Sequence, residues 1–141
     1  MARKLMILVL IFIIFISGCI GSPPKPNITM LCQLGANQIV AGSSTSFLIR
    51  VTNNDPKVYN NVALTYFTAS NIQFYQKGTL KNPPYLDTLT LNGLESQTLA
   101  YDIKGILQQG QFEGNYQITV NVLVDNTTID SCAQQLKIVA S

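Results

Sequence analysis

The chain has 141 residues, enough for one domain with a hydrophobic core. Hydrophobic residues make up 47% and charged residues only 11%, against roughly 25% charged in typical soluble domains. From Cys19 onward the basic and acidic residues are equal in number, so no basic patch predicts a nucleic-acid partner. The sequence contains no histidine, which excludes catalytic sites built on a Ser-His or Cys-His pair.

The N-terminal residues have the pattern of a secretory signal. The positively charged MARK precedes twelve apolar residues, Leu5–Ile16. A transmembrane helix needs about 20 apolar residues, so this run favours a signal peptide over a spanning helix. A short, uncleaved anchor helix is the alternative.

The next residues, Ile16-Ser17-Gly18-Cys19, resemble the lipobox of prokaryotic lipoproteins. The resemblance implies that residues 1–18 are removed and that Cys19 carries lipid, which would anchor the protein to the extracytoplasmic face of the cell membrane. An unmodified, buried cysteine is the alternative. Three prolines within Gly21–Asn27 favour an extended conformation, so residues 19–26 are expected to form a stiff tether.

From Asn27 onward, apolar and polar residues alternate with a period of two, which is typical of half-buried strands. In the clearest case, Phe47, Ile49 and Val51 share one face of a strand. Turn signals such as AGSS, NNDPK and VDNTT separate the strands. Strands are predicted at Thr45–Asn53, Asn60–Thr68, Gln97–Ile103, Asn115–Asp125 and Gln134–Ala140, with shorter ones at Ile28–Gln33, Ile72–Tyr75 and Asp87–Leu91.

This pattern predicts an all-β protein, an antiparallel β-sandwich of about seven or eight strands over residues 27–141. The order of TN at the end of a strand, GLESQT before another and GNYQITV near the C-terminus resembles CARDB-like and related immunoglobulin-like modules of prokaryotic surface proteins. In such a fold Tyr116 matches the position of a tyrosine corner; an ordinary core tyrosine is the alternative. The segment Asn71–Leu91 departs from the family pattern.

Two cysteines remain if Cys19 carries lipid. Cys32 alternates in phase with Ile28 and Met30, and Cys132 with Leu136 and Ile138, so both side chains are expected to point inward. They lie on the first and last predicted strands, which commonly run side by side in immunoglobulin-like folds. A Cys32–Cys132 disulfide is therefore predicted, with two free buried thiols as the alternative.

Other candidate sites are weaker. Asp125 and Asp130 flank one predicted hairpin and could contribute to a calcium site, although a plain hairpin turn is favoured. Asn27 and Asn126 begin N-glycosylation sequons, which are also frequent by chance in a chain rich in Asn and Thr. Three tyrosines in or near predicted loops could form a sugar platform, with simple packing as the alternative: Tyr59, Tyr75 and Tyr85.

No catalytic centre or cofactor site is predicted. The seven carboxylates are expected mostly at turns or on solvent-facing strand faces, so a glycosidase-like pair is only a remote alternative: Asp55, Asp87, Glu95, Asp102, Glu113, Asp125 and Asp130. The expected function is a lipid-anchored surface module that binds or spaces, with membrane lipid and an envelope protein as partners. The alternative is a structural subunit assembled by strand donation.

Overall fold

A computed structural model describes residues 24–107 and 112–140. These residues form ten β-strands and no helix, which confirms the predicted all-β class. The strands are β1 (Ile28–Leu34), β2 (Gln38–Val40), β3 (Ser44–Asn53), β4 (Tyr59–Phe67), β5 (Ile72–Gln76), β6 (Thr79–Leu80), β7 (Leu86–Leu91), β8 (Ser96–Gly105), β9 (Gly114–Val124) and β10 (Thr127–Val139).

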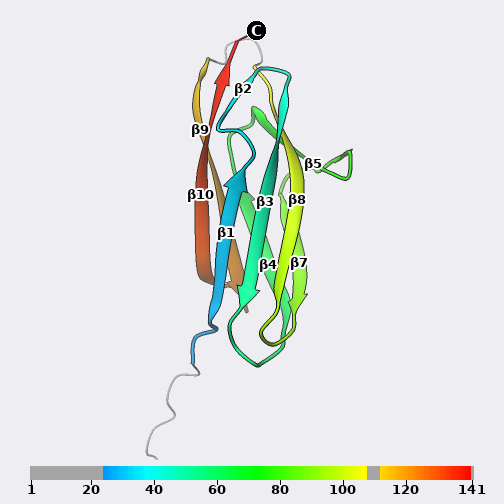
Figure 1. The fold of residues 1–141 in the computed structure, drawn as a ribbon, viewed down its shortest axis with the longest axis vertical. Helices are drawn as coiled ribbons and strands as arrows, with labels where there is room; N and C mark the ends of the chain where they lie inside the picture. The colour runs from blue at the N-terminus through cyan, green and yellow to red at the C-terminus, as the bar shows by residue number, and fades with distance from the viewer. Residues whose placement is uncertain (1–23, 108–111, 141) are drawn as a thin grey trace, which may run out of the picture.

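The strands form two packed sheets of five strands each (Figure 1). One sheet has the order β1-β3-β8-β5-β6 and the other β2-β10-β9-β4-β7. Residues 24–27 lead into β1 at one end of the elongated sandwich, and β10 ends at the opposite end (Figure 1). Within the described part of the chain, no helix is long and apolar enough to cross a membrane. The predicted N-terminal signal or anchor helix and Cys19 lie outside the described residues.

The core follows the predicted alternation. Phe47, Ile49 and Val51 on β3 are fully buried, as are Val62 and Leu64 on β4. Their neighbours along each strand face solvent or the sheet surface, so each sheet presents one apolar face to the other. Burial of these apolar faces is the main stabilisation of such a sandwich.

Two strands were not predicted because they are very short. β2 has three residues and β6 has two. β2 pairs with β10 in parallel, and its central residue, Ile39, opposes Ile138 in that pairing and joins the core. A single inward side chain gives no periodic signal, so only the long-range pairing reveals this strand.

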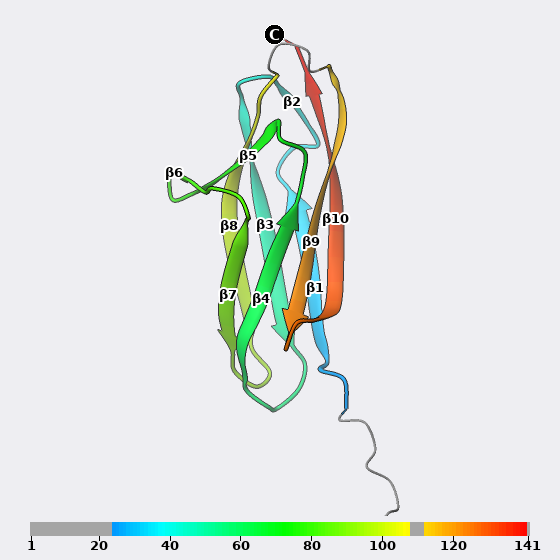
Figure 2. The same cartoon turned by 180° about the vertical axis from the view of Figure 1, so that it is seen from behind.

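The hairpin between β9 and β10 turns at Asp125 and Asn126, which both have positive φ (50° and 61°). Such a two-residue turn matches the right-handed twist of the strands, and Asp and Asn tolerate this backbone conformation well. The segment Asn71–Leu91, which departed from the family pattern, forms β5, β6 and β7. Figure 2 shows β5 and β6 projecting from the side of the sandwich before the chain returns to β7.

Candidate functional site

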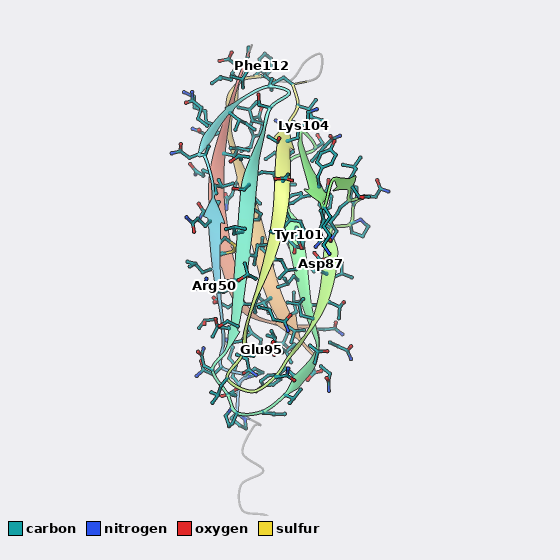
Figure 3. The ribbon with its side chains drawn as sticks, turned by 45° about the vertical axis from the view of Figure 1, so that its right-hand side comes forward. Arg50, Asp87, Glu95, Tyr101, Lys104 and Phe112 are labelled. Carbon is teal, nitrogen blue, oxygen red and sulfur yellow. A yellow bond between two sulfur atoms is a disulfide. The ribbon has the colours of Figure 1, made fainter. Side chains whose placement is uncertain are left out.

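A charged cluster lies between the two sheets on the side formed by β7 and β8. Asp87 on β7 is in phase with the inward residues Leu89 and Leu91, so its carboxylate points toward the core. Tyr66 on β4 and Tyr101 on β8 reach the same point from opposite sheets. Figure 3 shows Asp87 and Tyr101 close together at this side of the sandwich. We call the group formed by Tyr66, Lys81, Asp87 and Tyr101 the seam cluster.

The carboxylate of Asp87 is the centre of the seam cluster. The Tyr66 hydroxyl donates to Asp87 Oδ2 over 2.8 Å, and the Tyr101 hydroxyl donates to the same oxygen. Lys81 forms a salt bridge with Asp87 Oδ1. The two tyrosine hydroxyls also lie 2.7 Å from each other. Every polar group at this position therefore has a partner, as buried polar groups require.

Aromatic rings surround this charged pair. Lys81 Nζ lies 5.3 Å from the centre of the Tyr101 ring and 6.0 Å from that of Tyr66, within the range of cation–π attraction. Phe74 packs edge-on against both tyrosines. The side chains of Lys81 and Asp87 are only 20% and 16% exposed to solvent, so most of this ion pair is buried.

Asp87, Tyr66 and Tyr101 each stay in one protonation state around neutral pH. Burial alone would raise the pKa of Asp87, but hydrogen bonds from Lys81, Tyr101 and Tyr66 outweigh it and leave the pKa below its usual value. Burial and the neighbouring carboxylate raise the pKa of both tyrosines far above their usual value. A general acid or base needs a pKa near the working pH, so these groups are poorly suited to that role.

The sequence contained a signal for this site that the prediction missed. The carboxylates are expected mostly at turns or on solvent-facing strand faces, and Asp87 is an exception, because its side chain points inward. Its phase with Leu89 and Leu91 places it inward, and Tyr66 and Tyr101 are inward in their own strands. Lys81 lies just after the two-residue β6, where no periodicity could indicate its direction.

The opposite side of the sandwich is closed covalently. Cys32 on β1 and Cys132 on β10 form a disulfide with a Cα–Cα distance of 5.9 Å. The two strands belong to different sheets, so the bond joins the sheets across their edge. Asp130 Oδ2 accepts the Met30 backbone N–H at 2.7 Å, and the Gln134 side-chain amide donates to the Cys32 carbonyl at 3.1 Å. We call this group the disulfide seam.

Of the two calcium candidates, Asp130 accepts hydrogen bonds from backbone N–H groups. One carboxylate oxygen of Asp130 accepts the backbone N–H of Met30, and the other accepts the backbone N–H of Ser131. Asp125 sits at the tip of the hairpin. Across residues 24–107 and 112–140, no three Cys, Asp or Glu side chains gather where a metal ion could bind. Both predicted sequon asparagines, Asn27 and Asn126, are exposed.

Two of the three tyrosines considered as a sugar platform, Tyr75 and Tyr85, lie near enough to each other to interact electrostatically. Tyr59 is buried and donates its hydroxyl to Asp55, and Tyr85 packs against Phe74 at a ring distance of 4.9 Å. Only Tyr75 lies on an outer face, where it borders a shallow hollow. The Tyr116 hydroxyl donates to the backbone carbonyl of Phe112, which is the contact expected of a tyrosine corner.

A third polar group organises the end of the sandwich where the tether enters. Asn53 is fully buried, and its side-chain amide donates to the carbonyls of Lys57 and Asn92 at 2.7 and 2.8 Å. Asp55 accepts the Asn27 backbone N–H at 2.9 Å, which attaches the start of β1 to the β3–β4 loop. An open cleft of about 310 Å³ lies between the tether and the β9–β10 hairpin, bordered by Lys25, Lys57, Tyr59, Asp125 and Thr127, among others.

No known sequence family matches this chain, and no curated protein does. Solved structures do match it. The crystal structure of a CARDB domain from Pyrococcus furiosus, in complex with di-metal ions, has a TM-score of 0.60 and 15% identity, and the match covers 86% of this chain and 100% of that one. The solution structure of the same domain has a TM-score of 0.61 and 16% identity, with 83% and 98% covered.

A conjugative transposon lipoprotein from Bacteroides eggerthii also has a similar structure. Its TM-score is 0.56 at 12% identity, and the match covers 77% of this chain and 95% of that one. At such low identity, these similarities concern the fold alone. The chain therefore has a CARDB-like, immunoglobulin-like fold, as its sequence motifs suggested.

Proposed function

We propose that the protein is a lipid-anchored immunoglobulin-like module of the cell surface that acts by non-catalytic binding or spacing. The main supporting observation is the entry of the tether at one end of the elongated sandwich, while the C-terminal end of β10 lies at the other. With lipid on Cys19, the eight residues of the tether would hold the sandwich roughly 25 Å from the membrane if extended.

The connection between tether and sandwich supports a spacing role. Asn27 is held by its N–H bond to Asp55, and its carbonyl accepts the backbone N–H of Asn54 at 2.9 Å. The side chain of Asn54 also reaches Thr29 Oγ1 at 3.2 Å. These contacts hold Asn27, the residue that joins the tether to β1, against the β3–β4 loop, which would favour a defined orientation of the sandwich above the membrane.

The chemistry of the described side chains also favours a non-catalytic role. In the seam cluster the pKa of Asp87 is lowered and the pKa values of Tyr66 and Tyr101 are raised, so these three groups are poorly suited to transfer protons near neutral pH. The Pyrococcus furiosus domain was solved with di-metal ions, whereas the Cys, Asp and Glu side chains of residues 24–107 and 112–140 form no group of three or more that could hold a metal ion.

The anchor can be tested by replacing Cys19 with Ser in the full chain expressed in a prokaryotic host that processes lipoproteins. Wild-type protein should fractionate with membranes and have the mass of residues 19–141 plus lipid. The C19S variant should be released or remain unprocessed, whereas a Ser22→Ala control should behave like the wild type. Wild-type protein that retains residues 1–18 and carries no lipid would contradict the anchor.

A further inference from the structure

The two sheets have four edge strands, and three of them are short or covered. β2 has three residues and β6 has two. β1 is longer, but the disulfide and the side chains of Asp130 and Gln134 occupy its outer edge. β7 differs from all of these, because five of its six residues pair with β4 and no strand pairs with its other side. Figure 2 shows β7 as the outermost strand at its side of the sandwich.

The hydrogen bonds identify which backbone groups of β7 point outward. The Tyr85 carbonyl, just before the strand, accepts from Tyr66 on β4, so alternate residues starting with Tyr85 face β4. The remaining residues, Leu86, Thr88 and Thr90, therefore direct their N–H and C=O groups to the free edge. Within the described chain, only the Thr90 carbonyl has a partner there, the side-chain amide of Gln97 at 2.6 Å.

The side chains on this edge lack the usual protection against pairing. Natural edge strands are commonly blocked by lysine, proline or a bulge on the edge itself. Leu86, Thr88 and Thr90 are uncharged and exposed, and Leu86 is 53% exposed. The charged residue of the strand, Asp87, points inward to the seam cluster. Between Leu86 and Thr90 an incoming strand would meet no charge and no missing donor, and Pro83 and Pro84 just before β7 limit pairing to this stretch.

We propose that β7 pairs antiparallel with β7 of a second copy of this chain. Pairing centred on Thr88 would place Thr88 opposite its counterpart and Leu86 opposite the second copy's Thr90. The arrangement is self-complementary, as a two-fold interface requires, and would form roughly six backbone hydrogen bonds once Gln97 releases Thr90. Two five-stranded sheets would become one continuous sheet.

This symmetry determines how the two tethers would be placed. A two-fold axis perpendicular to the sheet makes the long axes of the two sandwiches antiparallel. The tether enters at one end of each sandwich, so the two tethers would leave from opposite ends of the dimer. Such a dimer would connect two facing surfaces. The pairing itself does not depend on the lipid anchor, so it can be tested whether or not Cys19 is acylated.

The contact is small and should be weak in solution. Stable interfaces bury about 1,600 Å² in total, more than the edge of one six-residue strand provides. We therefore expect a concentration-dependent equilibrium. Gln97 lowers the affinity further, because its bond to Thr90 must break before pairing. On a surface that carries many copies, multiple weak contacts would act together.

The test uses the full chain in detergent, with sedimentation velocity at increasing protein concentrations. Thr88→Pro removes an N–H that points to the free edge and should weaken dimerisation at least tenfold without breaking the β4–β7 ladder. Thr88→Val keeps the N–H and the branched side chain, so it should dimerise like the wild type. Gln97→Ala frees the Thr90 carbonyl and should strengthen dimerisation severalfold. Thermal melting checks that each variant remains folded.

If Thr88→Pro unfolds the domain, Thr88→Lys replaces it, since two facing lysines would repel each other. The proposal is overturned if wild type and Gln97→Ala remain monomeric at about 1 mM. It is also overturned if a dimer forms but neither Thr88→Pro nor Thr88→Lys weakens it. A dimer retained without lipid in the C19S variant would support β7 pairing even where the anchor proposal had failed.

Discussion

Between β1 and β10 the two sheets are joined by a covalent bond, whereas between β7 and β8 they are joined by one charged pair and two tyrosines. The disulfide links β1, an edge strand of one sheet, to β10, which lies next to edge strand β2 in the other sheet, and it closes a long loop of chain. The seam cluster joins the sheets through Tyr66 from one and Tyr101 from the other, which meet on the carboxylate of Asp87. The two sides therefore hold the same sandwich by different chemistry.

Because the two sides are held by different chemistry, they are expected to respond differently to reductants and to pH. A disulfide constrains the unfolded chain and responds to reductants, while its contribution changes little with pH over the neutral range. A carboxylate and two phenols respond to pH, because their protonation differs between folded and unfolded chains. The backbone edges also differ, since the disulfide seam covers β1 and the seam cluster leaves the edge of β7 open.

The largest effect is expected from removing the covalent side. The Cys32–Cys132 bond spans 100 residues, for which the chain-entropy estimate is about 4.7 kcal/mol as an upper value. A double Cys32→Ala, Cys132→Ala variant should lose about 3–4 kcal/mol and melt on the order of 15 °C lower. Reduced wild-type protein should melt like this variant, and a melting temperature unchanged by reduction would contradict the contribution assigned to the bond.

A smaller loss is expected from breaking the seam cluster. Asp87→Ala would leave Lys81 and two tyrosine hydroxyls without their acceptor. Breaking a fully buried pair costs about 3–5 kcal/mol, and the residual exposure of this pair reduces the expected loss to about 2–3 kcal/mol. Urea unfolding measures it. Asp102→Ala, on the exposed face of β8, is the matched control and should change stability by less than about 0.5 kcal/mol.

The seam cluster also predicts a dependence on pH at both extremes. The pKa of Asp87 is lowered by folding, so its stabilisation is present above its unfolded pKa of about 3.9 and is lost as pH falls through the lower, folded value. The pKa values of Tyr66 and Tyr101 are raised by folding, so their stabilisation is present below about pH 10 and decreases above it.

Substitutions can show which residues cause the loss of stability at acid pH (the acid limb) and at alkaline pH (the alkaline limb). Asp87→Asn should reduce the acid limb, and Tyr66→Phe combined with Tyr101→Phe should reduce the alkaline limb. Tyr59 and Tyr85 would keep a part of the alkaline limb, because folding also raises their pKa values. Melting temperatures between pH 2.5 and 11 provide the measurement, with the disulfide kept oxidised. Asp55 and Glu95 also have lowered pKa values, so part of the acid limb should persist in Asp87→Asn. An alkaline limb unchanged by both Tyr→Phe substitutions would contradict the assignment.

Much of this fold could be predicted from the sequence because alternation is a local property. The strand faces of β3, β4 and β9 follow from a period of two, and the inward phase of Cys32 follows from Ile28. The seam cluster could be predicted only in part. The phase of Asp87 was visible, but its meeting with Tyr101 depends on sheet order, and Lys81 lies beyond any periodic segment.

The pairing of β2 also lay beyond prediction. Its three residues join β10 in parallel, in a contact set by the path of the chain after β1. The closure of the β1 edge is a similar case. Asp130 was considered as a metal ligand because it lies near a hairpin, yet its partner is the backbone of Met30, 100 residues away. The carboxylate of Asp130 is a possible metal ligand by its chemistry alone, and only the tertiary structure shows that it accepts the Met30 N–H.

The smallest expected effect concerns these edge-covering side chains of the disulfide seam. Asp130→Ala leaves the Met30 N–H without its acceptor and should lower the free energy of unfolding by about 1 kcal/mol. Gln134→Ala should lower it by about 0.5 kcal/mol, because the hydrogen bond from Gln134 to the Cys32 carbonyl joins two neutral groups and is weaker than one to a carboxylate. Gln135→Ala, on the outer face of β10, is the control. Hydrogen exchange of the Met30 amide should accelerate in Asp130→Ala and remain unchanged in the control.

A double-mutant cycle can then show whether these side chains depend on the disulfide. The disulfide holds β10 against β1, so the bond from Asp130 to Met30 is made between groups that are already positioned. Without the disulfide, the two edges are free to separate, and Asp130→Ala should cost less than it does in the oxidised protein. If Asp130→Ala lowers the free energy of unfolding equally with and without the disulfide, the hydrogen bonds position the β1 edge on their own. The disulfide would then only reinforce an edge that the polar contacts already cover.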